Sequence, residues 1–403
     1  MQAIILVAGE GARMRPLTYT RPKVMLPLAN KPLLEHLLVN LRGAGISEFI
    51  FVVGYCQEAV RSYFGGGEAW DVHIDYVVQE AQLGSGHALQ VARGLVRESF
   101  LLVNGDAIVG QEDIRRIMDK GLLGMSIAEV ENTHGLGVVE IEGDRVVRIH
   151  EKVADSPTKL ANAGVYFLTS DIFDILPRLK ESPRGEYEIV DLLQLLIDQG
   201  RIVTHETISF WLHLSYPWEL LSANELMVGG IESEVLGVVE DGAVCKGPVR
   251  IGRGTVVRAN SYIVGPVVVG ENCEIGPNCY IRPATCIGDN CHVGAAVEIK
   301  NSIVMRNSKI PHHNYVGDSV IGEGCNLGSG TKVANLRLDK GNITVNGVDT
   351  GRRKLGVIMG DGVQTSINVS INVGCMIGNN TIIGPASVAS GEIPPNHRVF
   401  KSK

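Results

Sequence analysis

From about residue 237 onward, an apolar residue recurs at every sixth position of the chain. The first unbroken register consists of Cys245, Ile251, Val257, Ile263, Val269, Ile275, Ile281, Ile287, Val293 and Ile299. After small shifts, the register resumes at Val304, Ile310, Val316, Ile321, Leu327, Val333, Met359, Thr365, Ile371, Ile377, Ile383 and Ala389. A period of six fits neither a helix nor simple strand alternation. It is typical of a parallel β-helix, in which each hexad forms one short strand and one turn.

Composition supports this interpretation of the second half. Glycine supplies 48 of the 403 residues, well above the usual ~7%, and aromatic residues make up only 5%. Glycine often follows the apolar residue of a hexad, as at Gly252, Gly270 and Gly288, where a tight turn leaves little room for a Cβ atom. A narrow core also explains the shortage of aromatic rings. We therefore predict a β-helix domain over residues 237–403.

The cysteines follow the same pattern. Small or β-branched residues stand two positions before each apolar residue, and five cysteines occupy such inward positions: Cys273, Cys279, Cys291, Cys325 and Cys375. Cys245 takes an apolar position, and Cys56 and Cys286 lie outside the pattern. The sequence contains no C-x-x-C pair, so we predict structural thiols instead of a zinc site or disulfides.

Residues 1–228 alternate strand-like apolar runs with helical patterns. We expect strands at residues 3–7, 49–53, 73–78, 100–103, 138–141 and 164–168, and helices at 32–41, 58–64, 86–96 and 187–197. This alternation favours βαβ units and a mainly parallel sheet with helices on both faces. We therefore predict an α/β, Rossmann-like domain over residues 1–228.

The first predicted strand runs into a glycine-rich loop with fixed cations, Val7-Ala8-Gly9-Glu10-Gly11-Ala12-Arg13, followed by Arg21-Pro22-Lys23. Glycines let backbone N–H groups approach phosphate oxygens, and Arg13 and Lys23 add positive charge for a transferring phosphoryl group. A dinucleotide fingerprint would need a third glycine, where this chain has Met14, and a carboxylate after the second strand. A Walker A loop is also absent.

Further motifs make the pattern specific. They are Leu26-Pro27, Lys31-Pro32-Leu33, Gln79, Leu83-Gly84-Ser85-Gly86-His87-Ala88, Asn104-Gly105-Asp106, Glu151-Lys152, Asn162-Ala163-Gly164 and Gly185-Glu186-Tyr187-Glu188-Ile189-Val190-Asp191. With the glycine-rich loop, this ordered set over about 220 residues resembles the sugar-1-phosphate nucleotidylyltransferases. The resemblance implies in-line attack of a sugar 1-phosphate oxygen on the α-phosphorus of a nucleoside triphosphate, with release of pyrophosphate.

The resemblance also implies roles for individual residues. Arg13 and Lys23 act on the phosphates during the reaction, and Asp106 binds Mg²⁺. The nucleotide-binding residues are Ala8, Gly9, Gly11, Gln79, Gly84 and Ser85. Gly137, Glu151 and Asn162 contact the sugar phosphate. One departure concerns the family motif Trp-x-Asp-x-Gly, whose Asp is a second metal ligand: this chain has His213 there, which leaves His213 as a ligand or as a structural or sugar-contacting residue.

A second set of candidate residues lies in the hexapeptide region. Arg282 and Lys300 are 18 residues apart, which is three hexads and one turn of a triangular prism, so we expect the two cations to stack. Such a pair suits a phosphate. His312 follows in order, and an imidazole is a suitable base near neutral pH.

The stretch from Val297 to Thr331, including Pro311-His312-His313-Asn314-Tyr315-Val316-Gly317-Asp318, closely resembles the acetyltransferase half of the bifunctional N-acetylglucosamine-1-phosphate uridyltransferases. By that resemblance, His312 is the general base for the sugar amine, and Ser329 lines the acetyl-CoA slot. Residues assigned to the sugar phosphate are Arg282, Lys300, Tyr315, Asn326, Asn335 and Lys354. Resemblance to hexapeptide proteins further implies a left-handed coil and a homotrimer.

This second resemblance is incomplete. The family has Asn-Tyr-Asp where this chain has Asn335-Leu336-Arg337, and the following segment, residues 338–353, is longer than expected. The acceptor therefore stays open between glucosamine 1-phosphate and galactosamine 1-phosphate. The nucleotide stays open between UTP and dTTP.

Three functions compete at this point. The first is a bifunctional enzyme that acetylates an amino-sugar 1-phosphate with acetyl-CoA and then couples the product to UTP, giving UDP-N-acetylglucosamine. The second is a monofunctional glucose- or mannose-1-phosphate nucleotidylyltransferase, using dTTP, UTP or GTP, whose β-helix is structural. The third is a non-catalytic regulatory subunit, against which the intact Arg13, Lys23 and Asp106 argue.

Charge and hydropathy exclude other classes of protein. The net charge is −7 and no block of like charges stands out, so we expect no nucleic-acid partner. No apolar run approaches the ~20 residues that span a bilayer, and the N-terminus lacks a signal-peptide pattern. We therefore expect a cytoplasmic protein that does not contact membranes.

Overall fold

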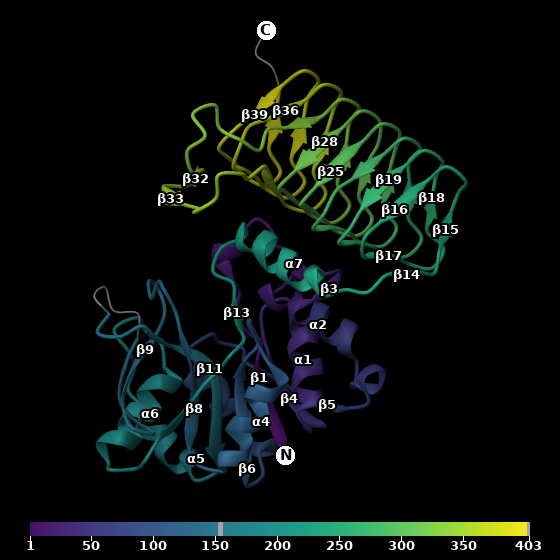
Figure 1. The fold of residues 1–403 in the computed structure, drawn as a ribbon. Coiled ribbons are helices and arrows are strands. Elements are labelled where there is room, and N and C mark those ends of the chain that lie inside the picture. The colour runs from purple at the N-terminus through teal and green to yellow at the C-terminus, as the bar shows by residue number, and fades with distance from the viewer. Residues whose placement is uncertain (152–155, 401–403) are drawn as a thin grey trace. The chain divides into compact units, whose positions relative to one another are not determined.

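The computed structural model describes residues 1–151 and 156–400. By their contacts, these residues form two compact units. The first comprises Met1–Glu10, Arg21–Met25 and Pro32–His213, and the second comprises Gly11–Thr20, Leu26–Lys31 and Leu214–Lys403. The predicted fold class is confirmed: a Rossmann-like domain is followed by a left-handed parallel β-helix (Figure 1).

A nine-stranded sheet forms the centre of the first unit, in the order β5-β4-β1-β6-β11-β8-β12-β10-β9. Its strands are β1 Gln2–Leu6, β4 Glu48–Val53, β5 His73–Val78, β6 Ser99–Asn104, β8 Gly124–Glu129, β9 Val138–Glu142, β10 Arg145–His150, β11 Leu160–Thr169 and β12 Thr204–Thr207. Strands β5, β4, β1 and β6 are parallel, as predicted. The other half is mixed, because β11 runs antiparallel to both β6 and β8.

Helices cover both faces of this sheet (Figure 1). They are α1 Leu33–Gly43, α2 Gln57–Phe64, α3 Ser85–Val91, α4 Gln111–Lys120, α5 Ile172–Ile175 and α6 Ile189–Asp198. Helix α1 packs on one face through Leu34, Leu37, Leu38 and Leu41, which have helical spacing. The helix predicted over residues 86–96 is shorter than expected: α3 ends at Val91, and a 3₁₀ turn containing the poor helix former glycine follows.

Short strands β2 Pro27–Leu28 and β3 Lys31–Pro32 pair with each other, as do β7 Ala107–Val109 and β13 Trp211–His213. The second unit adds helix α7, Glu219–Gly229, beside the β-helix. The buried Asn224 side chain of α7 donates to the Ala284 carbonyl and accepts from the Cys286 thiol. The middle of α7 is therefore fixed to the prism.

The β-helix is a prism of three parallel sheets. The first sheet, of nine strands, contains β14 Glu234–Val235, β17 Val249–Ile251, β20 Val267–Val269, β23 Thr285–Ile287, β26 Ile303–Val304, β29 Val320–Ile321, β34 Val357–Met359, β37 Cys375–Ile377 and β40 Glu392–Ile393. The second, also of nine, contains β15 Val238–Val239, β18 Val256–Val257, β21 Glu274–Ile275, β24 His292–Val293, β27 Lys309–Ile310, β30 Asn326–Leu327, β35 Gln364–Thr365, β38 Ile382–Ile383 and β41 Arg398–Val399.

The third sheet has eight strands: β16 Val244–Lys246, β19 Tyr262–Val264, β22 Tyr280–Ile281, β25 Glu298–Lys300, β28 Tyr315–Gly317, β31 Lys332–Val333, β36 Ser370–Ile371 and β39 Val388–Ala389. Each strand pairs in parallel with the strand one coil later, as Ile263 does with Ile281 and Ile281 with Ile299. These coils therefore take 18 residues, as the hexad pattern predicts, and some later coils take 17 or 16. The apolar hexad residues fill the interior, and those from Ile251 to Ala389 are buried.

Two backbone positions restrict which residues can occupy the turns. A Cβ atom on Gly288 would lie 2.7 Å from the Arg306 amide nitrogen of the next coil, so this glycine permits close stacking of the coils. Two residues later, Asn290 has φ 56°, in the left-handed region. Asparagine tolerates this region and fills the equivalent position in many coils: Asn260, Asn272, Asn278, Asn307, Asn368, Asn380 and Asn396.

A loop interrupts the stack between β31 and β34. It contains the hairpin of β32 Thr344–Val345 and β33 Val348–Asp349, and a bridge between Leu336 and Lys354 closes its base. Figure 1 shows this hairpin projecting from the side of the prism. Because the loop leaves and re-enters the prism at adjacent coils, β29 still pairs directly with β34.

All eight cysteines are free thiols, and every one except Cys56 and Cys245 is buried. Burial raises the pKa of Cys279 to about 11 and that of Cys291 to about 12. The interpretation of the inward cysteines as structural residues fits these surroundings. Among the described residues, no helix is both long and apolar enough to cross a membrane.

We expect Gly288→Ala to destabilise the protein by roughly 1–3 kcal/mol, because the added methyl group forces adjacent coils apart. Asn290→Gly, two residues away, is the matched control and should change stability by less than about 1 kcal/mol, because glycine also adopts positive φ. Denaturant unfolding of both variants measures the difference. Equal stability of Gly288→Ala and wild type would contradict the close-stacking explanation.

Candidate functional sites

In the first unit, several predicted site residues gather at one edge of the nine-stranded sheet. β1 ends before Val7-Ala8-Gly9, and β6 ends before Gly105-Asp106. β11 is antiparallel to β6, so its early residues Asn162 and Gly164 lie at the same edge. A Cβ atom on Gly164 would lie 2.6 Å from the side-chain amide nitrogen of Asn104, so this glycine leaves room for Asn104 where β11 passes β6. Ligands of open α/β sheets bind at this kind of edge.

Lys23 and Asp106 form the charged centre of this edge. The Lys23 Nζ lies 2.8 Å from Asp106 Oδ2, and the lysine side chain is only 10% exposed. Burial opposes the ionisation of Asp106, but Lys23 and then His213 outweigh it and hold the pKa of this carboxyl well below its usual range. Asp106 is therefore a carboxylate throughout the physiological pH range.

His213 also lies close to Asp106. β13 pairs antiparallel with β7 so that His213 lies opposite Ala107, and its Nε2 is 3.8 Å from Asp106 Oδ2. The imidazole stacks on the ring of Trp211. His213 thus occupies a position beside the proposed metal-binding carboxylate, and its role as a ligand stays a hypothesis.

The residues assigned to the nucleotide base come together on the Leu83–Gly86 turn. The buried Gln79 side chain donates to the Gly84 carbonyl at 3.0 Å. Gly84 has φ 99°, and a Cβ atom there would lie 2.5 Å from the Tyr187 carbonyl oxygen. Ser85 Oγ accepts from the Ile189 amide at the start of α6, so this hydroxyl stabilises the fold by an internal hydrogen bond. Gln82, which no motif predicted, also lies here, and its side chain donates to the Ala8 carbonyl at 2.9 Å.

The residues assigned to the sugar also form one cluster. The Asn162 amide donates to the Gly137 carbonyl, and its side chain donates to the buried Tyr166 hydroxyl at 2.7 Å. A Cβ atom on Gly137 would lie 2.6 Å from Glu151 Oε2, so a larger residue would displace Glu151. Arg184, which the sequence analysis did not identify, lies 3.2 Å from Glu151 and also pairs with Glu188.

Gly11 and Arg13 belong to the second compact unit. Gly11 has φ 66°, a conformation that suits glycine, and its carbonyl accepts from the Thr18 hydroxyl. The Arg13 guanidinium lies 5.9 Å from the centre of the Tyr216 ring. An aromatic face restrains the guanidinium without neutralising its charge.

The donor set of the first unit fits a magnesium ion that arrives with a nucleotide. Mg²⁺ is commonly held by one or two carboxylates, together with substrate phosphates and water. Asp106 supplies one partly exposed carboxylate. Within the described parts of the chain, no group of three or more His, Cys, Asp or Glu side chains could hold a metal ion unaided. The phosphates of a bound nucleotide would therefore complete the coordination.

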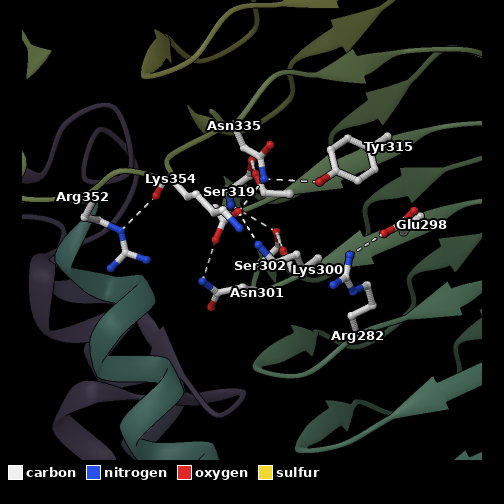
Figure 2. A network of polar contacts seen from close by, with 12 residues as sticks. Arg282, Glu298, Lys300, Asn301, Ser302, Tyr315, Ser319, Asn335, Arg352 and Lys354 are labelled. Carbon is white, nitrogen blue, oxygen red and sulfur yellow. Dashed lines mark hydrogen bonds and ion pairs between the residues drawn. The ribbon is translucent and has the colours of Figure 1, made fainter. Parts of the chain in front are cut away.

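The second set of residues forms a polar network at one corner of the prism (Figure 2). Arg282 and Lys300 end successive coils of the third sheet, so they stack as predicted, but each is already paired with a carboxylate. Arg282 lies 2.9 Å from Glu298, and Lys300 lies 2.9 Å from Asp318. The buried Asp318 also accepts from Asn335 and Asn301. The Asn335 amide group reaches Tyr315 Oη at 3.3 Å.

His312 lies on a different corner, in the exposed turn between β27 and β28. Its carbonyl accepts from the Gly330 amide, so this turn stacks on the Ser329 turn of the next coil. Asn326 lies on the sheet before that turn. The strand Tyr315–Gly317 separates the His312 corner from the Asp318 corner, a rise of about 10 Å for three extended residues. In one chain, His312, Asn326 and Ser329 are thus grouped apart from Arg282, Lys300 and Asn335.

Comparisons with known proteins agree with this architecture. Residues 2–226 match the nucleotidyl transferase family, and residues 263–373 match the GMPPB C-terminal domain. The chain is 43% identical to the bifunctional protein GlmU of Methanococcus maripaludis strain C7, covering 100% of this chain and 97% of the relative. It is 36% identical to a bifunctional sugar-1-phosphate nucleotidylyltransferase/acetyltransferase of Sulfurisphaera tokodaii, covering 98% of each chain.

Among solved structures, a putative glucose-1-phosphate thymidylyltransferase from Bacillus anthracis is similar, with a TM-score of 0.52 and 27% identity. The match covers 56% of this chain and 94% of that one. The similarity of the curated relatives extends across both the Rossmann-like domain and the prism. The chain therefore belongs to the nucleotidyl transferase family and, over its full length, to the family of bifunctional GlmU proteins.

Proposed function

We propose that this chain is a bifunctional enzyme that makes UDP-N-acetylglucosamine from UTP, acetyl-CoA and glucosamine 1-phosphate. Residues 1–228 carry the nucleotidyl transfer and residues 237–403 carry the acetyl transfer. The full-length relatives named as bifunctional proteins support this proposal and do not favour a purely structural prism or a regulatory subunit. Both co-substrates are intracellular metabolites, so we place the reaction in the cytoplasm.

The Lys23–Asp106 pair is the observation that carries the first half of the proposal. A sugar 1-phosphate oxygen attacks the α-phosphorus of UTP, a new P–O bond forms, and the bond to pyrophosphate breaks. Lys23, held at 2.8 Å from Asp106, lies where positive charge stabilises the α-phosphate region. Asp106 would hold Mg²⁺, which supplies charge neutralisation on the phosphates when bound.

The other residues of the family motifs then have positioning roles. Gln79 and Gly84 address the uracil, and the backbone of Ala8, Gly9 and Gly11 with Arg13 holds the triphosphate. Glu151, Asn162 and Gly137 bind the sugar. The buried hydrogen bonds of Gln79 and Asn162 support these roles, because they fix both side chains before substrate arrives. We further propose that the enzyme uses UTP in preference to dTTP.

We expect Asp106→Asn to lower Mg²⁺-dependent pyrophosphate release at least about 100-fold, because the amide removes the charge that holds the metal and partners Lys23. Asp75→Asn, at an exposed carboxyl on β5, is the matched control and should retain activity. A coupled assay of pyrophosphate release from UTP and N-acetylglucosamine 1-phosphate measures both. Full activity of Asp106→Asn would refute the proposed metal site.

In the acetyl transfer, His312 removes a proton from the sugar ammonium group, and the free amine attacks the thioester carbonyl of acetyl-CoA. An amide bond forms, the C–S bond breaks, and the CoA thiolate leaves and takes up a proton. The imidazole is exposed and has no hydrogen-bond partner in the described part of the chain, so it is open to substrate. The neighbouring Ser329 turn supports an acetyl-CoA slot beside it.

His312→Ala should lower acetyl transfer to glucosamine 1-phosphate by about 10²–10⁴-fold and leave uridylyl transfer unchanged. His313→Asn is a close control, because His313 has φ 57° and asparagine accepts that conformation. Thiol release from acetyl-CoA reports the rate. A His313→Asn variant that loses as much activity as His312→Ala would point to damage of the turn instead. Galactosamine 1-phosphate, assayed in parallel, determines the acceptor.

We also propose that the enzyme is a homotrimer assembled along its prism. The outward residues of the first sheet are all buried, namely Val268, Cys286, Ile303, Val320, Ile358 and Met376. The third sheet instead exposes Val244, Tyr280 and Val388. Exposed apolar side chains on one face of a sheet are typical of a subunit interface.

Sedimentation equilibrium should give about three times the 43.4 kDa mass of one chain. Val388→Glu, at a side chain 60% exposed on β39, should shift the mass toward the monomer, because it places a charge in the interface. Leu122→Glu, at a side chain 56% exposed in the first unit, tests whether any new acidic group has this effect. A monomeric wild type would contradict the proposal.

A further inference from the structure

One inward position of the prism holds a side chain of a different kind from the others. From Ala243 to Ser387, the residues two positions before each apolar hexad residue are alanine, valine, serine, threonine or cysteine, except at Asn314. The Asn314 side chain is buried, at 2% exposure, so its carboxamide lies inside the prism. It belongs to the coil that carries His312 and follows this predicted base by two residues. The exceptional residue and the proposed acetyl-transfer base therefore occur together.

The amide group of Asn314 uses both of its hydrogen atoms. Its Nδ2 donates to the Pro311 carbonyl at 3.2 Å and to the Leu327 carbonyl at 3.4 Å. Because both partners are carbonyl oxygens, they require the NH₂ group of the carboxamide to face them. Pro311 immediately precedes His312, and Leu327 lies two residues before Ser329 in the next coil. One side chain thus links the turn of the predicted base to the strand that enters the predicted acetyl-CoA turn.

A hydroxyl or a thiol could not make this pair of contacts with two separate hydrogen atoms. Each has one hydrogen to donate, as Ser308 Oγ does to the Gly322 carbonyl at 2.8 Å. The carboxamide of Asn314 donates two, but its Oδ1 atom is buried without a hydrogen-bond partner in the described part of the chain. An unpaired buried acceptor lowers stability, and serine would avoid it. Stability alone therefore does not account for an amide at this position.

The contacts of Asn314 restrain the backbone of His312. On one side, the His312 carbonyl accepts from the Gly330 amide at 3.2 Å. On the other side, the Pro311 carbonyl accepts only from Asn314, as far as the described residues show. These contacts hold the two peptide groups that flank the His312 Cα atom, so side-chain rotation alone directs the imidazole. Such restraint matters for catalysis, because misplacing a reacting group by about 1 Å can cost roughly 100-fold in rate.

We propose that Asn314 is a positioning residue for acetyl transfer, which acts through His312 by holding its turn against the next coil. This inference rests on the proposed function, in which His312 is the general base. Asn314 is buried inside the prism, so it does not contact substrate. Its loss therefore affects turnover, which depends on the direction of the imidazole, more than it affects substrate binding.

The test variant is Asn314→Ser, because the prism already has serine at the inward positions Ser302 and Ser308. Serine retains one donor and loses the second, so the link between Pro311 and Leu327 is broken. We expect kcat of acetyl transfer to fall about 10-fold or more, with uridylyl transfer unchanged and the KM values for glucosamine 1-phosphate and acetyl-CoA changed less than about threefold. Thiol release from acetyl-CoA gives kcat and KM, and the thermal unfolding midpoint checks folding.

A combined variant, Asn314→Ser with His312→Ala, separates positioning from a general structural role. If Asn314 acts through His312, its substitution has no further effect once the imidazole is absent, so the combined variant keeps the residual rate of His312→Ala. A general structural role would lower that residual rate by the same factor as in the wild type. Ser308→Ala is the matched control and should retain kcat, because this buried inward serine donates to the Gly322 carbonyl and not to the His312 turn.

Three results would each overturn the inference: unchanged kcat in Asn314→Ser, the same loss of kcat in Ser308→Ala, or a further loss in the combined variant. Asn314→Thr also lacks the second donor and introduces the residue type found one coil later at Thr331. It takes the place of Asn314→Ser in every comparison if the serine variant unfolds at the assay temperature.

These measurements also separate the inference from the proposed function. If the wild type transfers no acetyl group, or if His312→Ala retains full activity, the proposed role of His312 fails and the inference fails with it. If His312→Ala loses activity and Asn314→Ser does not, the proposed function stands and only the positioning role of Asn314 fails.

Discussion

The stacking of one coil on the next is the constraint on which the prism depends. Most coils repeat after 18 residues and some after 17 or 16, and strands of only two or three residues hydrogen bond to the coils on both sides. Neighbouring backbones approach so closely that Gly252 and Gly322, like Gly288, have no space for a Cβ atom. A single register therefore places a ladder of buried aliphatic side chains inside and leaves every corner open for polar residues. The polar network around Asp318 lies at one such corner.

A different constraint organises the nucleotidyl transferase unit. Parallel strands β4, β1 and β6 end at one edge, and β11 reaches the same edge from the opposite direction. Residues far apart in sequence, such as Lys23 and Asp106, consequently meet there at 2.8 Å. The close passage of β11 past Asn104 needs Gly164, just as the turn above Tyr187 needs Gly84.

Much of this could be predicted from the sequence, because burial imposes a periodicity that residue types reveal. The hexads identified the prism core residue by residue, and the ordered motifs predicted which residues meet at the sheet edge. The left-handed asparagine turns were missed, although asparagine precedes the small inward residue in many coils, as at Asn272 and Asn290. The ion pairs of Arg282 and Lys300 could not be predicted, because Glu298 and Asp318 have no motif of their own. Arg184 was missed for a similar reason: Glu188 is only four residues away, but its other partner, Glu151, is distant in sequence and only the fold brings the two together.

The buried thiols of the prism have a consequence for chemical probing of this protein. Cys273, Cys291 and Cys325 precede strands of the same sheet, so they form a row along one inner corner. A thiol in that row reacts with an alkylating reagent only when its coil opens, because the reactive thiolate is suppressed by burial and the reagent is excluded. The rate of alkylation at each cysteine therefore reports how often that level of the stack opens. The native cysteines can therefore report how local opening progresses along the β-helix.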